Sequence, residues 1–137
     1  MKYQMTDHTA DLGIRVFGQD LQALFADAAH ALSDLITDVS RLDGSETREF
    51  HISGDDWPDL MVNWLREALY LWTGEEMLIR RAEVLSMSEY ALHARVSCDP
   101  YAPDLHTIRH EIKAVTYHDI RVDRFSKGWE AQIIFDT

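Results

Sequence analysis

Cysteine, proline and glycine are all scarce in this sequence, with one, three and six residues respectively among 137. Because Cys98 is the only cysteine, it cannot form an intramolecular disulfide, and a structural zinc site built from several thiolates is disfavoured. The prolines and glycines are scattered and mark no linker, and no segment of about 20 to 50 residues recurs. We therefore expect a single domain over residues 1–137, in a reducing compartment.

Long apolar runs are also lacking. No stretch approaches the roughly 20 residues needed to cross a bilayer, and residues 1–11 do not resemble a signal peptide. We therefore predict a cytoplasmic protein with no membrane association. Apolar residues still make up 46% of the chain, which is enough to build one core.

Basic residues are few relative to acidic ones. The chain has 13 Lys and Arg against 24 Asp and Glu, a formal net charge of −11. Proteins that bind nucleic acid directly neutralise phosphates with a basic face, so this composition argues against direct binding of RNA or DNA. A basic protein surface, a divalent cation or simple solubility would each account for the charge.

The apolar pattern predicts an α+β fold. Alternating apolar residues predict strands at 12–17, 46–53, 77–87 and 90–98, and extended segments at about 111–118, 119–125 and 129–136. The segment 99–104, with two prolines, is expected to be a loop. Helical spacing predicts one helix running from residue 20 to about residue 38 and a second from 55 or 56 to about 73. We expect both helices to cover one face of a largely antiparallel sheet.

Both predicted helices have recognisable ends. Asp20 offers an N-cap oxygen to the first, and Asp55 or Asp56, followed by Pro58, begins the second. Gly74 is the residue type that readily adopts the left-handed conformation ending a helix. The apolar stripe of the second helix is expected to belong to the core rather than to a ligand pocket; it comprises Leu60, Met61, Trp64, Leu65, Ala68, Leu69 and Trp72.

The common catalytic signatures are absent. The sequence contains no phosphate-binding glycine loop and no nucleophile elbow, which disfavours nucleotide hydrolysis by this chain alone. Among the seven histidines, only His106 and His110 have a helical i, i+4 spacing, but prolines lie just upstream and no apolar helical stripe surrounds them. A zinc site on that pair is therefore disfavoured, and we interpret His30 as a surface or boundary residue.

Two carboxylates and an imidazole are concentrated in residues 7–11, immediately before the first predicted strand. This segment reads Asp7-His8-Thr9-Ala10-Asp11. Side chains at a strand end are held by the sheet yet open to solvent, which suits a functional site. Local turn chemistry is the more ordinary explanation, because Asp and Thr often bond to nearby backbone groups. Spacing alone therefore favours turn chemistry over a functional site.

The end of the sequence offers complementary ligands. The alternation in 129–136 continues to Phe135, so we expect burial of Phe135 to fix Asp136, followed by Thr137 and its α-carboxylate. Asp11, Asp136 and Thr137 would form an all-oxygen ligand set, which suits a hard divalent cation such as calcium, magnesium or manganese. This hypothesis requires that the strands carrying Asp11 and Asp136 run antiparallel or end on the same edge of the sheet.

Four blocks of the sequence, in order along the chain, resemble the archease family. They are Asp7–Arg15; Val62–Leu65 with Glu67, Leu69, Tyr70 and Leu71; Ile112–His118; and Phe135–Asp136. The likeness is weak only around residues 42–50 and 77–103. Members of the family commonly end in an aliphatic residue where this chain has Thr137.

The resemblance implies a non-catalytic partner of an RtcB-type RNA ligase. Such ligases use GTP and manganese to join RNA ends in tRNA splicing and RNA repair, and archeases promote guanylylation of the ligase and its turnover. The family's metal site maps onto Asp11, Asp136 and Thr137, whereas His8, Lys113 and His118 lie in matched blocks without an assigned role. Two alternatives remain: a stand-alone hydrolase that depends on a divalent metal, and an acidic adaptor or chaperone.

Overall fold

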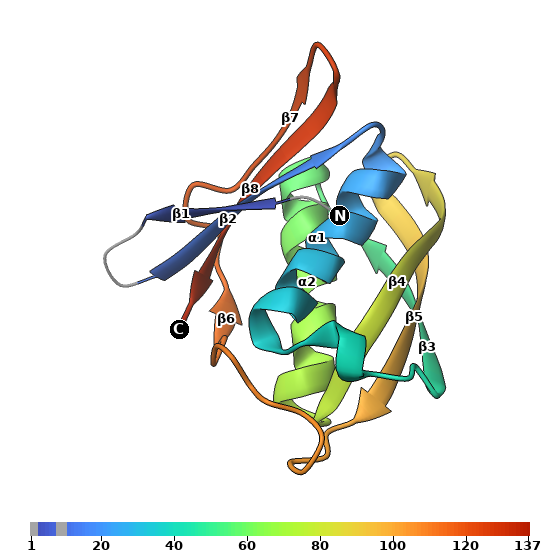
Figure 1. Ribbon diagram of the computed structural model, residues 1–137. Coiled ribbons are helices and arrows are strands. Elements are labelled where there is room, and N and C mark those ends of the chain that lie inside the picture. Colours follow the sequence, from blue (N-terminus) through green and yellow to red (C-terminus); the bar gives the residue numbers. More distant parts are fainter. Residues whose placement is uncertain (1–2, 8–10) are drawn as a thin grey trace.

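The chain folds into two antiparallel β-sheets with two α-helices packed between them (Figure 1). This computed structural model describes residues 3–7 and 11–137. One sheet has five strands and the other three, and every pairing between neighbouring strands is antiparallel. The prediction of an α+β fold built from two helices and antiparallel strands is therefore confirmed.

The five-stranded sheet is assembled from both ends of the sequence. Its order is β1-β2-β8-β6, and β7 also pairs with β8. β6 and β7 lie along the same edge of β8, one after the other. The strands are β1 (Tyr3–Asp7), β2 (Asp11–Gly18), β6 (Ala114–Val115), β7 (Arg121–Phe125) and β8 (Gly128–Asp136).

The three-stranded sheet comes from the middle of the chain. Its order is β3-β5-β4, with β3 (Glu46–Ser53), β4 (Met77–Ser88) and β5 (Ala91–Pro100). Asp99, near the end of β5, fastens the loop that precedes β3: its carboxylate accepts hydrogen bonds from the Gly44 and Ser45 amides at 2.6 and 3.0 Å. The Ser45 hydroxyl donates a third bond at 2.8 Å.

The two helices bury their apolar stripes between the sheets. α1 (Leu21–Ile36) contacts β2 and β8 on one side and β4 on the other, while α2 (Trp57–Thr73) contacts β3 and β4 as well as β6 and β7. Asp20 caps α1 and Asp56 caps α2, as predicted. The α2 stripe is fully buried from Leu60 to Leu69, and only Trp72 is partly exposed.

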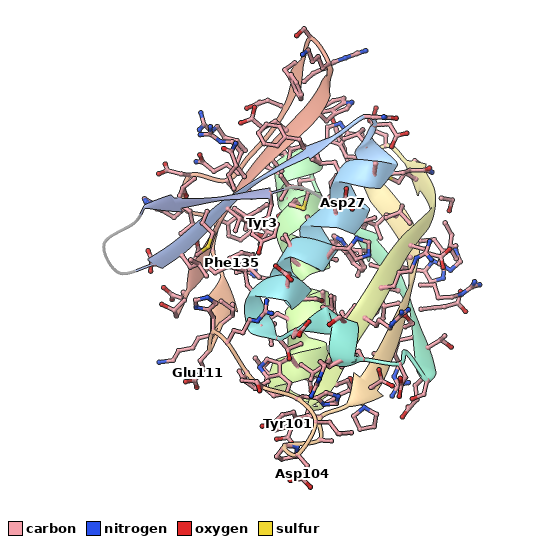
Figure 2. The ribbon with its side chains drawn as sticks, in the orientation of Figure 1. Tyr3, Asp27, Tyr101, Asp104, Glu111 and Phe135 are labelled. Atoms are coloured by element: carbon pink, nitrogen blue, oxygen red, sulfur yellow. The ribbon has the colours of Figure 1, made fainter. Side chains whose placement is uncertain are left out.

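A buried hydrogen bond joins the helices. The indole Nε1 of Trp64 on α2 donates to the Phe25 carbonyl of α1 at 2.9 Å, and both side chains are inaccessible to solvent. Buried polar groups of this kind are costly to leave unpaired, so the bond fixes how the helices pack. A second hydrogen bond joins β1 to α1: the hydroxyl of Tyr3, labelled in Figure 2, donates to the Asp34 carboxylate at 2.6 Å.

Several sequence predictions of the fold were wrong in detail. Instead of one sheet there are two, because β4 and β5 pair with β3 and not with the strands at the chain ends. The first helix ends at Ile36 rather than near residue 38, and Val39–Arg41 form a separate 3₁₀ turn. Only Ala114–Val115 of the extended segment 111–118 pair as a strand, and β5 continues through Pro100 into the predicted loop. β1 was not predicted.

Gly74 does not adopt the predicted left-handed conformation. Its φ of −100° and ψ of −33° are right-handed, and Glu76, with φ of 54°, takes the left-handed position instead. A Cβ at residue 74 would meet the ring of Tyr70 one turn earlier in α2, and that ring is 57% exposed and would have to turn aside. The left-handed ending inferred from the residue type at position 74 is therefore wrong.

Candidate metal centre

Asp11 and Asp136 lie directly opposite each other in the five-stranded sheet. Asp11 begins β2, Asp136 ends β8, and the antiparallel register makes them Cα partners. The strand geometry that the sequence hypothesis required is therefore present. Figure 1 shows the start of β2, the C-terminus and β6 together at one edge of the molecule.

The pair points away from the core. The neighbouring pair, Leu12 and Phe135, belongs to the face that packs on the helices, and Phe135 is completely buried there (Figure 2). Because successive side chains in a strand alternate between faces, Asp11 and Asp136 share the outer face. Asp136 is exposed and Asp11 is partly exposed. The two carboxylates are thus open to solvent on a backbone held by the core.

A third segment fixes the end of β8. Ala114 of β6 is the Cα partner of Asp136 on the side opposite Asp11. The Lys113 amide donates to the Asp136 carbonyl at 2.8 Å, and both the amide and the hydroxyl of Thr116 donate to the Ile134 carbonyl at 3.1 and 2.9 Å. β8 therefore has hydrogen-bonded neighbours on both sides up to Asp136. Sequence reasoning named Lys113 but missed this main-chain role.

The donor chemistry of the pair suits a hard cation. Directly opposite residues on antiparallel strands have Cβ atoms about 4.5 to 5.5 Å apart, and like charges at such positions destabilise a sheet. A divalent cation between the carboxylates would remove that repulsion, and carboxylate oxygens are the ligands preferred by calcium, magnesium and manganese. Thr137 follows Asp136 and is exposed. The residues present therefore fit such an ion.

The other sequence candidates lie elsewhere. His106 is buried, and its Nδ1 accepts a hydrogen bond from the Ala102 amide at 2.9 Å, so it organises its own loop. His30 is partly buried at the boundary, as expected; its Nε2 accepts from the Ala82 amide at 2.9 Å. His8, Thr9 and Ala10 lie outside the described residues.

The described part of the chain has neither a cluster of three metal-ligating side chains nor a membrane-spanning helix. Within residues 3–7 and 11–137, no three side chains of His, Cys, Asp or Glu come together as a metal site. Asp11 and Asp136 supply only two such side chains, so a bound ion would need further oxygens from the main chain or from water. Neither helix in those residues is long and apolar enough to span a membrane.

One cluster near the pair was not anticipated from sequence. Tyr117, just after β6, donates its hydroxyl to Asp59 of α2 at 2.7 Å, and the Arg66 guanidinium lies over the Tyr117 ring at 4.7 Å. This hydrogen bond raises the pKa of the Tyr117 hydroxyl. The pKa of the Asp59 carboxyl is lowered, first by the Asp55 amide and then by Tyr117. The cluster ties the segment after β6 to α2 and so supports the neighbouring end of β8.

Comparison with known proteins assigns the chain to a family. A model of the Archease protein family matches residues 3–137. "Protein archease" of Methanosarcina mazei is 33% identical over 139 aligned positions, covering 98% of this chain and 95% of that protein. "Protein archease" of Pyrococcus abyssi is 34% identical and covers 98% of both chains.

Solved structures share the fold. The solution structure of Methanobacterium thermoautotrophicum protein 1598 superposes with a TM-score of 0.78 at 27% identity, covering 98% of both chains. A crystal structure from Thermotoga maritima, described as an archease and possible chaperone, superposes with a TM-score of 0.64 and 21% identity. The superposition covers all of this chain and 98% of the other. At 21% identity the likeness is evidence for the fold alone.

Proposed function

The chain belongs to the archease family, and from that premise we propose that it activates an RtcB-type RNA ligase in tRNA splicing and RNA repair. In this proposal the chain is not itself a catalyst; it promotes guanylylation of the ligase and its turnover. The observation that carries the proposal is the placement of Asp11 opposite Asp136 on the solvent-exposed face of the sheet.

The residues assigned to the metal are Asp11, Asp136 and Thr137. A bound divalent cation would supply positive charge that can neutralise phosphate oxygens during nucleotidyl transfer. The chain's own contribution is to hold the two carboxylates at a fixed spacing: β2 and β6 flank Asp136, and Phe135 anchors it from the core side. Such rigid support is what a ligand pair needs if it is to present an ion in one position.

Charge supports the choice of partner. A ligase cleft that holds RNA must be basic, whereas this chain carries a formal net charge of −11. Opposite charges steer the two proteins together and set their orientation, so an acidic activator can approach the cleft without itself binding RNA. Asp136 is exposed and Asp11 is partly exposed, and they lie where the ends of β2 and β8 meet β6. The pair is therefore accessible to such a partner.

The test is ligase guanylylation with GTP and manganese, with and without this protein. The wild-type chain should stimulate formation of the ligase–GMP adduct, and Asp11→Asn and Asp136→Asn should each remove the stimulation. Asp104→Asn is the matched control, because Asp104 is an exposed carboxylate on a different loop. Stimulation that survives both Asp11→Asn and Asp136→Asn would refute the carboxylate mechanism, and no stimulation by the wild type would refute the partnership.

Two further arms separate the alternatives. The purified chain is incubated with manganese and a phosphodiester substrate; turnover that is lost in Asp136→Asn would favour a stand-alone hydrolase instead. An acidic adaptor or chaperone would support the ligase equally well with either Asn variant, since neither changes the fold or removes more than one of 24 acidic residues.

A further inference from the structure

Two histidines are stacked on the outer face of the three-stranded sheet, away from the carboxylate pair. His51 of β3 and His93 of β5 are Cα partners across the antiparallel register. Their rings are 4.2 Å apart between centroids and inclined by only 10°. Together with Ser53, Ser86 and Ser88 they line a hollow of about 440 Å³ on this face.

A carboxylate sets the orientation of one ring. The Nε2 of His93 lies 2.8 Å from Glu49 Oε1, and Glu49 is on the same face of β3 as His51, two residues away. An ionised carboxylate only accepts hydrogen bonds, so Nε2 must carry the proton. When the ring is neutral, the lone pair is therefore on Nδ1. A histidine whose second ring nitrogen donates to a carboxylate is the usual arrangement behind a metal ligand, because the carboxylate fixes the tautomer and raises the basicity of the ligating nitrogen.

The stacked pair places two imidazole side chains next to each other on this face. Neutral imidazole is the form that coordinates a metal, and it suits zinc, nickel and copper.

We propose that His51 and His93 form a second cation site, for a borderline divalent transition metal such as Zn²⁺ or Ni²⁺, with Glu49 as the orienting carboxylate. Nitrogens bound to one tetrahedral ion are about 3.3 Å apart. The lone pairs of parallel rings lie in the ring planes and point in parallel directions, so both side chains must turn out of the stack to bind one ion. The His51 side chain is exposed and that of His93 is partly exposed. Water and the serine hydroxyls of the hollow complete the coordination. This site differs in ligand type from the carboxylate pair, which offers only oxygen and suits calcium, magnesium or manganese.

The probe is Ni²⁺, titrated by calorimetry into untagged protein in excess Ca²⁺, which occupies oxygen sites. The wild type should bind one equivalent, and His51→Ala and His93→Ala should each abolish that phase. Glu49→Gln should weaken it by about tenfold or more, the usual effect of losing a carboxylate behind a ligand. His110→Ala, which removes an exposed histidine from another segment, is the matched control and should bind as the wild type does.

Melting curves establish that each variant is folded, which is expected because both histidines lie at the surface of the sheet. One-equivalent binding that persists in both His51→Ala and His93→Ala would overturn the proposal. So would a wild type that binds no Ni²⁺, or binding that disappears in His110→Ala alone. None of these results depends on the ligase, since the carboxylate pair and its partner are not used in the measurement.

Discussion

Phe135 offers a quantitative test of how the end of β8 is held. Its side chain is completely buried, and the strand that carries it has hydrogen-bonded neighbours on both sides, β2 through Leu12 and β6 through Val115. Replacing Phe135 by Ala removes most of a phenyl ring from a site whose backbone cannot easily collapse inward. Phe→Ala substitutions in such cores cost about 3 to 5 kcal/mol, and the rigid surroundings place this one toward the upper part of that range.

The measurement is urea unfolding followed by tryptophan fluorescence. The wild type and Phe135→Ala should unfold with the same m-value, so that the shift in midpoint reports the change in the free energy of unfolding. Leu105→Ala is the control, because Leu105 is 61% exposed and its loss should change the free energy of unfolding by no more than about 0.5 kcal/mol. If Phe135→Ala lowers the free energy of unfolding by less than about 1 kcal/mol, the inference that burial of Phe135 anchors the adjacent Asp136 is contradicted.

Two other substitutions test the supports of the fold. Asp99→Asn should lower the free energy of unfolding at neutral pH by about 1.5 to 3 kcal/mol, because three donors lose an ionised acceptor; an unchanged urea midpoint would contradict this. Burial raises the pKa of Asp99, but bonds from Ser45 and Gly44 together outweigh it and hold that pKa below the usual range. The stabilisation that the Asp99 carboxylate gives the fold is therefore complete above the ordinary pKa of Asp, and it is lost as the pH falls through the lower pKa of the folded state. The Asn variant has no such carboxylate, so on acidification its free energy of unfolding should fall less than that of the wild type. Trp64→Phe should cost about 1 to 3 kcal/mol, measured by denaturation followed by circular dichroism, because the Phe25 carbonyl loses its buried donor; wild-type stability would show that the bond contributes nothing.

Strong periodicity made the middle of the fold predictable. The strand 46–53 and both helix N-caps were placed correctly, since alternation and capping are local signals that the sequence carries in full. The division into two sheets was not predictable in this way. It depends on which strands pair, and β2 pairs with β8 across almost the whole length of the chain. The extended segment predicted at 111–118 was longer than the observed strand β6, because only two of its residues pair with a neighbouring strand.

The candidate carboxylates were found from sequence in two steps. The alternation that ends in Phe135 predicted a fixed Asp136, and ligand chemistry grouped it with Asp11. The family resemblance then mapped a metal site onto both residues. What sequence could not supply was the register that sets these residues opposite each other, or the amide of Lys113 that holds the Asp136 carbonyl. The stacking of His51 on His93 could not be predicted from the sequence either. The two residues are 42 positions apart and meet only through the pairing of β3 with β5.

Calorimetric titration with Ca²⁺, repeated with Mn²⁺, examines the carboxylate pair without any partner protein. One ion should bind each wild-type chain, and Asp11→Asn and Asp136→Asn should each abolish that binding, whereas Asp104→Asn should retain it. Failure of the wild type to bind either ion, or equal binding by all four proteins, would contradict the proposal that Asp11 and Asp136 hold a divalent cation.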